Sequence, residues 1–487
     1  MMRPDRRRNI ARVACSWAFF AVSLGLVAQA WSQGIRLPAN LGPSFGAAPV
    51  TPAPGRAGLK PYVAFAWAPT APLGHVSTMV RFGLDTNPLD LVLASKALPP
   101  GCRVFLSASL TNGLLDQRED RCRDAAGNFV DQQGIWPEHG VSAVAALCDR
   151  FFGAFTEAGG QCDLISLDFE ENYSNWVMAP ERLRAVTADP RFPAVAAKLG
   201  LPGTDNPEQI AQRLIDWRNS NGLYLKWNSV TDGFVADAVN RAIGGPLWRH
   251  LPAAGFCNFD SCVVTPANAF PDSNGNMFYD EGPMVGNYQC PSISGVVGNI
   301  AIVGIPGDWK APFTSLLHSA NLVRACVRSS NAPVLTWVCY RSWPGDEPGH
   351  PVAPYGNTDY WQESLYHALL SGGTTNVFYF NPRPDHQDIF AKPKPGVPTL
   401  EDDQAVDAAL AEIEQQAHGH VFSKPLFTQP VAYTDQALVS AAKTDEGRMV
   451  ARVSFAAGVE AADVKIAGQT IHVMRPAGRV GAWVNVP

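Results

Sequence analysis

The feature that most constrains the fold is an alternation of short β-type runs with longer helical patterns between Leu59 and about His418. Parallel strands need crossover connections long enough for a helix, so this order predicts parallel strands joined by helices. About seven or eight such units favour a (β/α)8 TIM-like barrel over an open sheet. The predicted strands are Tyr62–Trp67, Arg103–Leu110, Leu164–Glu170, Gly255–Phe259, Pro283–Tyr288, Val334–Tyr340 and Asn376–Asn381.

Helices are expected between these strands wherever apolar residues recur at helical spacing. Val141–Glu157 has this spacing and is followed by a Gly-Gly pair, which ends a helix readily. Trp361–Leu370 and Asp402–Gln416 are two further predicted helices. No Gly-rich phosphate loop follows the first predicted strand, which argues against a dinucleotide-binding fold.

The two ends of the chain differ in composition from this central region. Residues 1–30 combine an Arg-rich start, the apolar run Val13–Val27 and the tripeptide Ala28-Gln29-Ala30, as in a secretory signal peptide. Residues 31–58 form a Pro/Gly/Ala-rich leader. We therefore expect a secreted or periplasmic protein with no stable membrane span after signal removal, and Arg7-Arg8 leaves a twin-arginine route open.

The catalytic barrel is expected over residues 59–418 and a small β-domain over residues 419–487. In the latter, Met449–Phe455, Val464–Ile466 and Gln469–Met474 have the pattern of strands separated by turns. Such a domain could bind carbohydrate or only cover a face of the barrel, and the sequence leaves both open.

Composition narrows the function. The net charge is -6 with only 17% charged residues and no basic run after the signal, which argues against nucleic acid as a partner. The 13 Trp, 24 Phe and 11 Tyr, beside 42 Gly and 40 Pro, are typical of loop-rich secreted enzymes and sugar-binding clefts. A polysaccharide or oligosaccharide substrate is therefore expected.

The cysteine pattern indicates structural roles rather than metal-binding or catalytic ones. Of 10 cysteines, Cys15 lies in the signal, so an odd number remains and at least one thiol should be free. The spacing allows local bridges between Cys102 and Cys122 and between Cys257 and Cys262. No pair has the spacing of a zinc knuckle, and neither a metal nor a cofactor is expected.

The segment that carries chemistry is Cys162–Trp176, in which an apolar strand ends abruptly in Asp168, Glu170 and Glu171. Residues two apart share a face of a strand, so Asp168 and Glu170 should point together into the barrel mouth, where barrel enzymes place catalytic groups. Each carboxylate raises the proton affinity of the other, which suits Glu170 to act as a general acid. The alternative interpretation is that these are strand-end and solvated loop charges.

This segment resembles the corresponding strand of the hyaluronidase family, in which Asp-aromatic-Glu is followed by an aromatic-rich turn. The resemblance extends in order and spacing to other segments. They are Leu59–Thr70 with its Trp and Pro-Thr, Gly134–Pro137, Ala254–Cys262, Val334–Tyr340 and Glu363–Asn381. It implies a hyaluronidase-like glycoside hydrolase on a TIM barrel, and Asp163 to Glu170 distantly resembles the catalytic strand of chitinases, with Ser166 in place of an Asp.

The resemblance also implies roles for individual residues. Glu170 matches the proton donor, Asp168 the carboxylate that positions the substrate N-acetyl group, and Tyr288 a tyrosine that assists it. The substrate-binding candidates are Glu171, Trp67, Asp260, Tyr340, Trp343, Phe380 and Asn381. Phe380 stands where both families usually have Trp, and Asn172-Tyr173-Ser174 replaces a Trp-Arg-Pro turn, so hyaluronan itself is not predicted.

The sequence thus predicts an exported glycoside hydrolase acting on a polysaccharide that contains N-acetylhexosamine. Glu170 would be the general acid and Asp168 would orient the acetamido group, giving a retaining, substrate-assisted reaction. Two alternatives stay open. One is a glycosidase with a base or nucleophile from another strand, acting on other glycans; the other is a barrel that binds glycans without cleaving them.

Overall fold

The structure is a computed structural model of the 487-residue chain. It describes residues 60–66, 74–97, 104–109, 117–168, 180–199, 206–215, 237–259, 270–271, 277–278, 312–329, 334–339, 358–380 and 400–486. The predicted signal peptide, the leader and the predicted strand Pro283–Tyr288 lie outside these residues.

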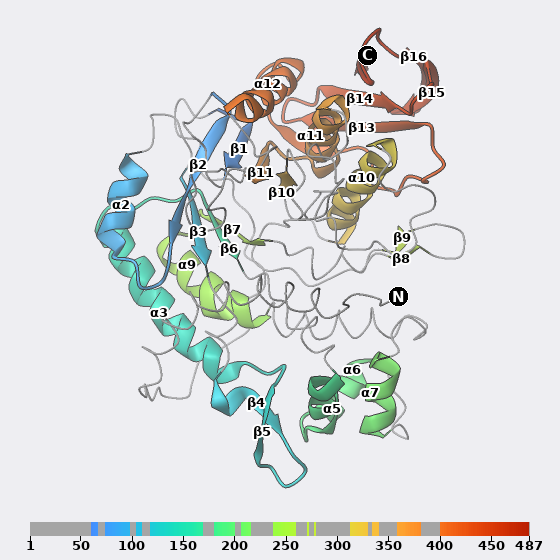
Figure 1. Ribbon diagram of the computed structural model, residues 1–487. Helices are drawn as coiled ribbons and strands as arrows, with labels where there is room; N and C mark the ends of the chain where they lie inside the picture. The colour runs from blue at the N-terminus through green and yellow to red at the C-terminus, as the bar shows by residue number, and fades with distance from the viewer. Residues whose placement is uncertain are drawn as a thin grey trace, which may run out of the picture.

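The centre of the fold is a sheet of seven described strands, all parallel to their neighbours. Their order is β10-β11-β1-β2-β3-β6-β7, so the last two strands in sequence lie beside the first (Figure 1). The strands are β1 (Val63–Ala66), β2 (Val76–Phe82), β3 (Phe105–Ser109), β6 (Leu164–Asp168), β7 (Gly255–Phe259), β10 (Thr336–Cys339) and β11 (Asn376–Phe380).

This strand order is the one expected of a (β/α)8 barrel, which would need one further strand between β7 and β10. The predicted strand Pro283–Tyr288 falls in that interval of the sequence. The α/β class with parallel strands is therefore confirmed, whereas closure into a barrel stays a prediction.

Strand alternation divides the sheet into a helix-covered face and an opposite face. Leu106, Ile165 and Phe256 lie at the same level on β3, β6 and β7, and all three belong to the cluster formed with the covering helices. Ser166 lies one position along from Ile165, so it is on the opposite face, where it is 1% exposed.

Two groups of helices cover the first face. On one side lie α2 (Pro88–Lys96), α3 (Glu138–Glu157), a π-helical turn η4 (Asn240–Gly244) and α9 (Gly245–His250). On the other lie α10 (Pro312–Ser329), α11 (Thr358–Gly372) and α12 (Leu400–Gln416).

The ends of these helices follow from local chemistry. Asn87 caps α2 by accepting a hydrogen bond from Leu89 N at 3.1 Å. At the end of α3, Gly159 takes a φ of 81°, which glycine adopts without steric cost.

Insertions after β3 and β6 form a separate small unit. The hairpin of β4 (Arg121–Arg123) and β5 (Phe129–Gln133) follows the 3-10 turn η2 (Arg118–Asp120), and α5 (Pro180–Ala188), α6 (Phe192–Leu199) and α7 (Pro207–Ile215) follow β6. The two insertions share one apolar cluster. It contains Cys122, Ile135, Leu183, Val186, Phe192, Val195, Ile210 and Ala211. We call this unit the loop subdomain.

The C-terminal residues form an antiparallel sheet in the order β12-β13-β14-β17, with a hairpin of β15 and β16 on its far side. The strands are β12 (Phe422–Pro425), β13 (Ala437–Thr444), β14 (Met449–Phe455), β15 (Ala461–Ile466), β16 (Gln469–Met474) and β17 (Gly481–Asn485). Leu438, Ala442 and Val450 share a hydrophobic core with α10, α11 and α12. The sheet therefore covers the helices on one side of the parallel sheet, as Figure 1 shows.

Several elements differ from the sequence prediction. Strand β2 was not predicted, because Ser77, Thr78 and Arg81 interrupt its apolar residues. Strands β12, β13 and β17 were also not predicted. The short two-residue pair β8 (Phe270–Pro271) and β9 (Met277–Phe278) completes the described strands.

The proposed local disulfides are not formed. Cys122 and Cys257 are both buried free thiols, while Cys102 and Cys262 lie outside the described residues. Burial raises the pKa of Cys122, and likewise that of Cys148, to about 12, so both stay protonated at neutral pH. Their surroundings favour packing roles over nucleophilic ones.

Gly373 gives a test of how tightly the C-terminal sheet is attached. Its φ is 59°, and a Cβ there would lie 2.5 Å from Pro425 Cδ on β12. Gly373→Ala should therefore lower the free energy of unfolding by about 3 kcal/mol, combining left-handed strain with overpacking. Gly419→Ala is the control, because Gly419 has a φ of 78° but no atom within 4 Å of its Cβ position, so only about 1 kcal/mol is expected. If urea unfolding showed the same loss of unfolding free energy for both variants, the close contact between Gly373 and Pro425 would be contradicted.

Candidate active site

The candidate site lies where the parallel strands end at their carboxyl termini. Strand β6 ends at Asp168, which is level with Ser109 at the end of β3 and with Phe259 at the end of β7. Position 168 is two residues after Ser166, so it lies on the face of the sheet opposite the helices. The backbone thus places position 168 where the sequence predicts it, at the carboxyl edge.

Strand β11 reaches the same edge. It ends at Phe380, which is level with Cys339 at the end of β10. Val377 belongs to the cluster formed with α10, α11 and α12, so position 380, three residues on, lies on the opposite face. Positions 168 and 380 therefore share both the edge and the face.

Most of the predicted site residues cannot be placed. Glu170, Glu171, Tyr288, Trp67, Asp260, Tyr340, Trp343 and Asn381 lie outside the described residues, and for Asp168 and Phe380 the backbone alone is described. Their predicted roles stay predictions.

The amino end of β6 is fixed by Asp163. Its carboxylate accepts a hydrogen bond from Val104 N at 2.6 Å, and its own backbone N–H donates to Val104 O at 2.9 Å. These bonds set the register of β6 against β3, and through it the height of Asp168 at the other end. Asp163 therefore orders the strand rather than taking part at its carboxyl edge.

The loop subdomain belongs to this edge, because its two parts leave the carboxyl ends of β3 and β6. In Figure 1 strands β2 and β3 point toward the half of the molecule that holds β4, β5 and α5 to α7. Asp189 joins the parts: it accepts hydrogen bonds from the Arg191 side chain at 2.8 Å and from Arg123 N at 2.8 Å. Arg191 also stacks on Trp136 at 4.1 Å. The insertion after β6 is thus held to the insertion after β3, the neighbouring strand.

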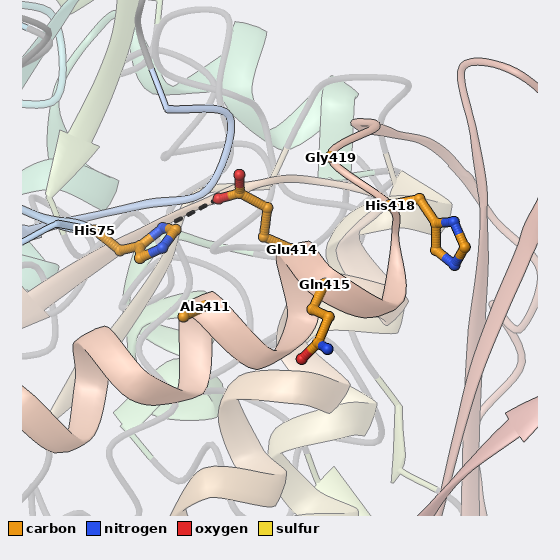
Figure 2. A pocket seen from close by; sticks show the side chains of 6 residues that line it. All are labelled: His75, Ala411, Glu414, Gln415, His418 and Gly419. Atoms are coloured by element: carbon orange, nitrogen blue, oxygen red, sulfur yellow. Dashed lines mark ion pairs between the residues drawn. The ribbon is translucent and has the colours of Figure 1, made fainter.

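An open pocket of about 600 Å³ lies at the opposite, amino end of the strands. It is lined by His75, just before β2, by Glu414 and Gln415 at the end of α12, and by His418 just after that helix (Figure 2). His75 Nδ1 lies 3.0 Å from the carbonyl of Tyr62 and 3.3 Å from Glu414 Oε2, so Nδ1 carries the proton. Because it is at the wrong end of the sheet, this pocket is not the candidate active site.

No group of three or more His, Cys, Asp or Glu side chains that could hold a metal ion occurs within the described ranges. Among the helices described there, none is both long and apolar enough to cross a membrane.

The sequence interpretation missed a polar cluster between α11 and the C-terminal sheet. Glu363, His367 and Ser371 are buried there, and Arg452 pairs with Glu363. The signal was available, since three polar residues recur at four-residue spacing along the helix and therefore share one face. Their partners, however, are more than 60 residues away in sequence.

No protein-family model matches the chain, and no curated protein is similar to it in sequence. Among solved structures it is similar to an endo-β-1,6-glucanase, with TM-score 0.32 and 10% identity over 81% of this chain and 73% of that one. The catalytic domain of GH30 xylanase C from Talaromyces cellulolyticus has TM-score 0.34 and 9% identity, and the match covers 83% of this chain and 86% of that one. An endo-β-1,4-mannanase double mutant from Cellulomonas fimi has TM-score 0.28 and 12% sequence identity, and the match covers 87% of this chain and 89% of that one. Likeness this low identifies neither a family nor an activity for this chain.

Proposed function

We propose that the protein is an exported glycoside hydrolase that cleaves a polysaccharide containing N-acetylhexosamine. The observation that carries the proposal is the end of β6. An apolar strand of a parallel sheet stops at Asp168 on the face away from the helices, and the sequence continues Phe169-Glu170-Glu171. A carboxylate pair in this position is the arrangement that barrel glycosidases use.

In the proposed reaction Glu170 protonates the glycosidic oxygen as the bond from that oxygen to the anomeric carbon breaks. The carbonyl oxygen of the substrate's own acetamido group forms a new bond to the anomeric carbon from the opposite face. Asp168 accepts the acetamido N–H and stabilises the positive charge that develops on it. Water then attacks the anomeric carbon, returns its proton to Glu170 and restores the acetamido group, so the configuration is retained.

Two further features support this proposal. The backbone of β11 ends at Phe380, at the same carboxyl edge as Asp168, and an aromatic residue at this edge suits a sugar-binding cleft. The N-terminal 30 residues have the order of a secretory signal, which would bring the enzyme to polymers outside the cytoplasm.

The test is a screen of the purified mature protein for reducing ends released from hyaluronan, chondroitin, chitin oligomers, peptidoglycan glycan and uronic-acid polymers. We expect release from a polymer that contains N-acetylhexosamine, and the first product should keep the anomeric configuration of the substrate when followed by NMR. Inversion would instead indicate a base from another strand. Tight binding of an oligosaccharide without any product would favour a non-catalytic glycan-binding barrel.

A further inference from the structure

The C-terminal sheet meets α11 through a buried polar centre. Glu363, His367 and Ser371 lie four residues apart on α11 and therefore share one face of the helix. On the sheet, Ser440 of β13 and Ser454 of β14 face them. All five side chains are buried, and apolar residues of β13 and β14 surround them on the same face. We call these five residues the polar centre.

The hydrogen bonds of the polar centre run in one direction. Ser454 Oγ donates to Glu363 Oε2 at 2.6 Å, so it must accept from His367 Nε2 at 2.8 Å. The proton of neutral His367 is therefore on Nε2, and Nδ1 accepts from Ser440 Oγ at 2.8 Å. Ser440 in turn accepts from Ser371 Oγ at 2.8 Å.

With the hydrogen bonds in these directions, Nδ1 of His367 has no acceptor for a second proton. Ser440 Oγ also accepts from the Arg324 guanidinium at 3.2 Å, so both of its lone pairs are used while its own hydrogen points at Nδ1. A proton on Nδ1 would place two donors face to face. To accommodate it, the Ser440 hydroxyl must turn away from Nδ1 and donate to Ser371 Oγ instead, which reverses the buried Ser371–Ser440 hydrogen bond.

The charged groups around His367 also disfavour its protonation. Arg324 faces it from α10 and Arg452 from β14, while Glu363, the acidic residue of the polar centre, is already paired with Arg452 and bonded to Ser454. Burial, and then the two guanidinium groups, hold the pKa of His367 well below its usual value.

We infer that the polar centre makes the attachment of the C-terminal sheet to α11 an acid-sensitive latch. In the closed state His367 must be neutral, and in the opened state it is exposed to water and can take a proton. Falling pH therefore favours the opened state. Mild acid should release β13 and β14 from α11 before the parallel sheet and its other helices unfold.

The pH window follows from linkage. The pKa of His367 is lowered in the closed state, so its contribution to stability is fully present above the usual histidine pKa of about 6.5 and is lost as the pH falls below it. Until the closed-state pKa is reached, the opening equilibrium should rise about tenfold for each pH unit.

Hydrogen–deuterium exchange of the full chain, corrected for the intrinsic rate at each pH, measures this opening. Peptides from β13 and β14 should lose protection about tenfold per unit between pH 6 and pH 4.5, while peptides from α3 keep theirs. In His367→Gln, which retains one donor and one acceptor but does not titrate, the slope should disappear. His367→Asn serves the same purpose if the glutamine variant does not fold.

His472→Gln is the matched control, because His472 lies exposed on β16 and bonds Asp463 at 2.7 Å outside the polar centre. It should keep the wild-type slope. The latch is overturned if wild-type protection of β13 and β14 does not change with pH, if α3 opens in parallel with them, or if His367→Gln shows the same slope as the wild type.

Discussion

Replacing Glu170 by glutamine should lower kcat about 10²–10⁴-fold on the polymer that the wild type cleaves, with little change in KM. The amide keeps the size and polarity of the side chain, so sugar binding is retained. It has no proton of suitable acidity for the leaving oxygen, so the transition state loses its acid.

Glu171→Gln is the matched control, since it removes the same charge from the adjacent residue, for which a substrate-binding role and not the acid role is predicted. It should lower kcat by far less than Glu170→Gln. A substrate with a strongly acidic leaving group needs no proton, so Glu170→Gln should keep most of its rate of bond cleavage on an aryl glycoside of the same sugar. Equal losses in the two variants would remove Glu170 from its proposed role.

Breaking the buried ion pair between Glu363 and Arg452 should destabilise the fold by about 3–5 kcal/mol. Glu363 and Arg452 are 3% and 2% exposed, and the guanidinium Nε donates to Glu363 Oε2 at 2.8 Å, with a second bond from Nη2 to Oε1. Arg452 also lies 4.9 Å from the centre of the Tyr366 ring and 4.8 Å from that of Trp483. Arg452→Met would leave the carboxylate of Glu363 buried without its partner.

Urea unfolding of Arg452→Met, Glu363→Met and the double variant would measure this effect. The double variant should be less destabilised than the sum of the two single variants, because an uncompensated charge is no longer present. Arg184→Met is the control: its ion pair with Glu208 is exposed, so a loss below about 1 kcal/mol is expected. A loss that small for Arg452→Met would show that water reaches the polar centre.

The C-terminal sheet is packed against the helices of the parallel sheet and is hydrogen-bonded to α11. Its strands share a core with α10, α11 and α12, and its polar side chains complete the hydrogen bonding of α11. This packing on α10, α11 and α12 favours one of the two roles left open by the sequence, that of covering a face of the predicted barrel.

The sequence by itself determined the features that depend on neighbouring residues. Strand β7 occupies Gly255–Phe259 as predicted, β14 and β16 also have their predicted bounds, and α3 differs by only a few residues at its start. These elements follow from periodicity and from glycine stops, which act over a few residues. For the same reason β6 begins at Leu164 as predicted, although it ends at Asp168, two residues before the predicted end at Glu170.

Only the tertiary structure decided which distant elements meet. The joining of two loop insertions into the loop subdomain and the pairing of Glu363 with Arg452 each connect residues far apart in the chain. Strand β2 was missed because one of its faces carries Ser77 and Arg81, and such a face is recognisable only once the neighbouring strands are known. The local sequence pattern determines helices and strands, because the interactions that form them join residues close in sequence. Which helices and strands pack together depends on burial and on hydrogen-bond satisfaction across the whole fold.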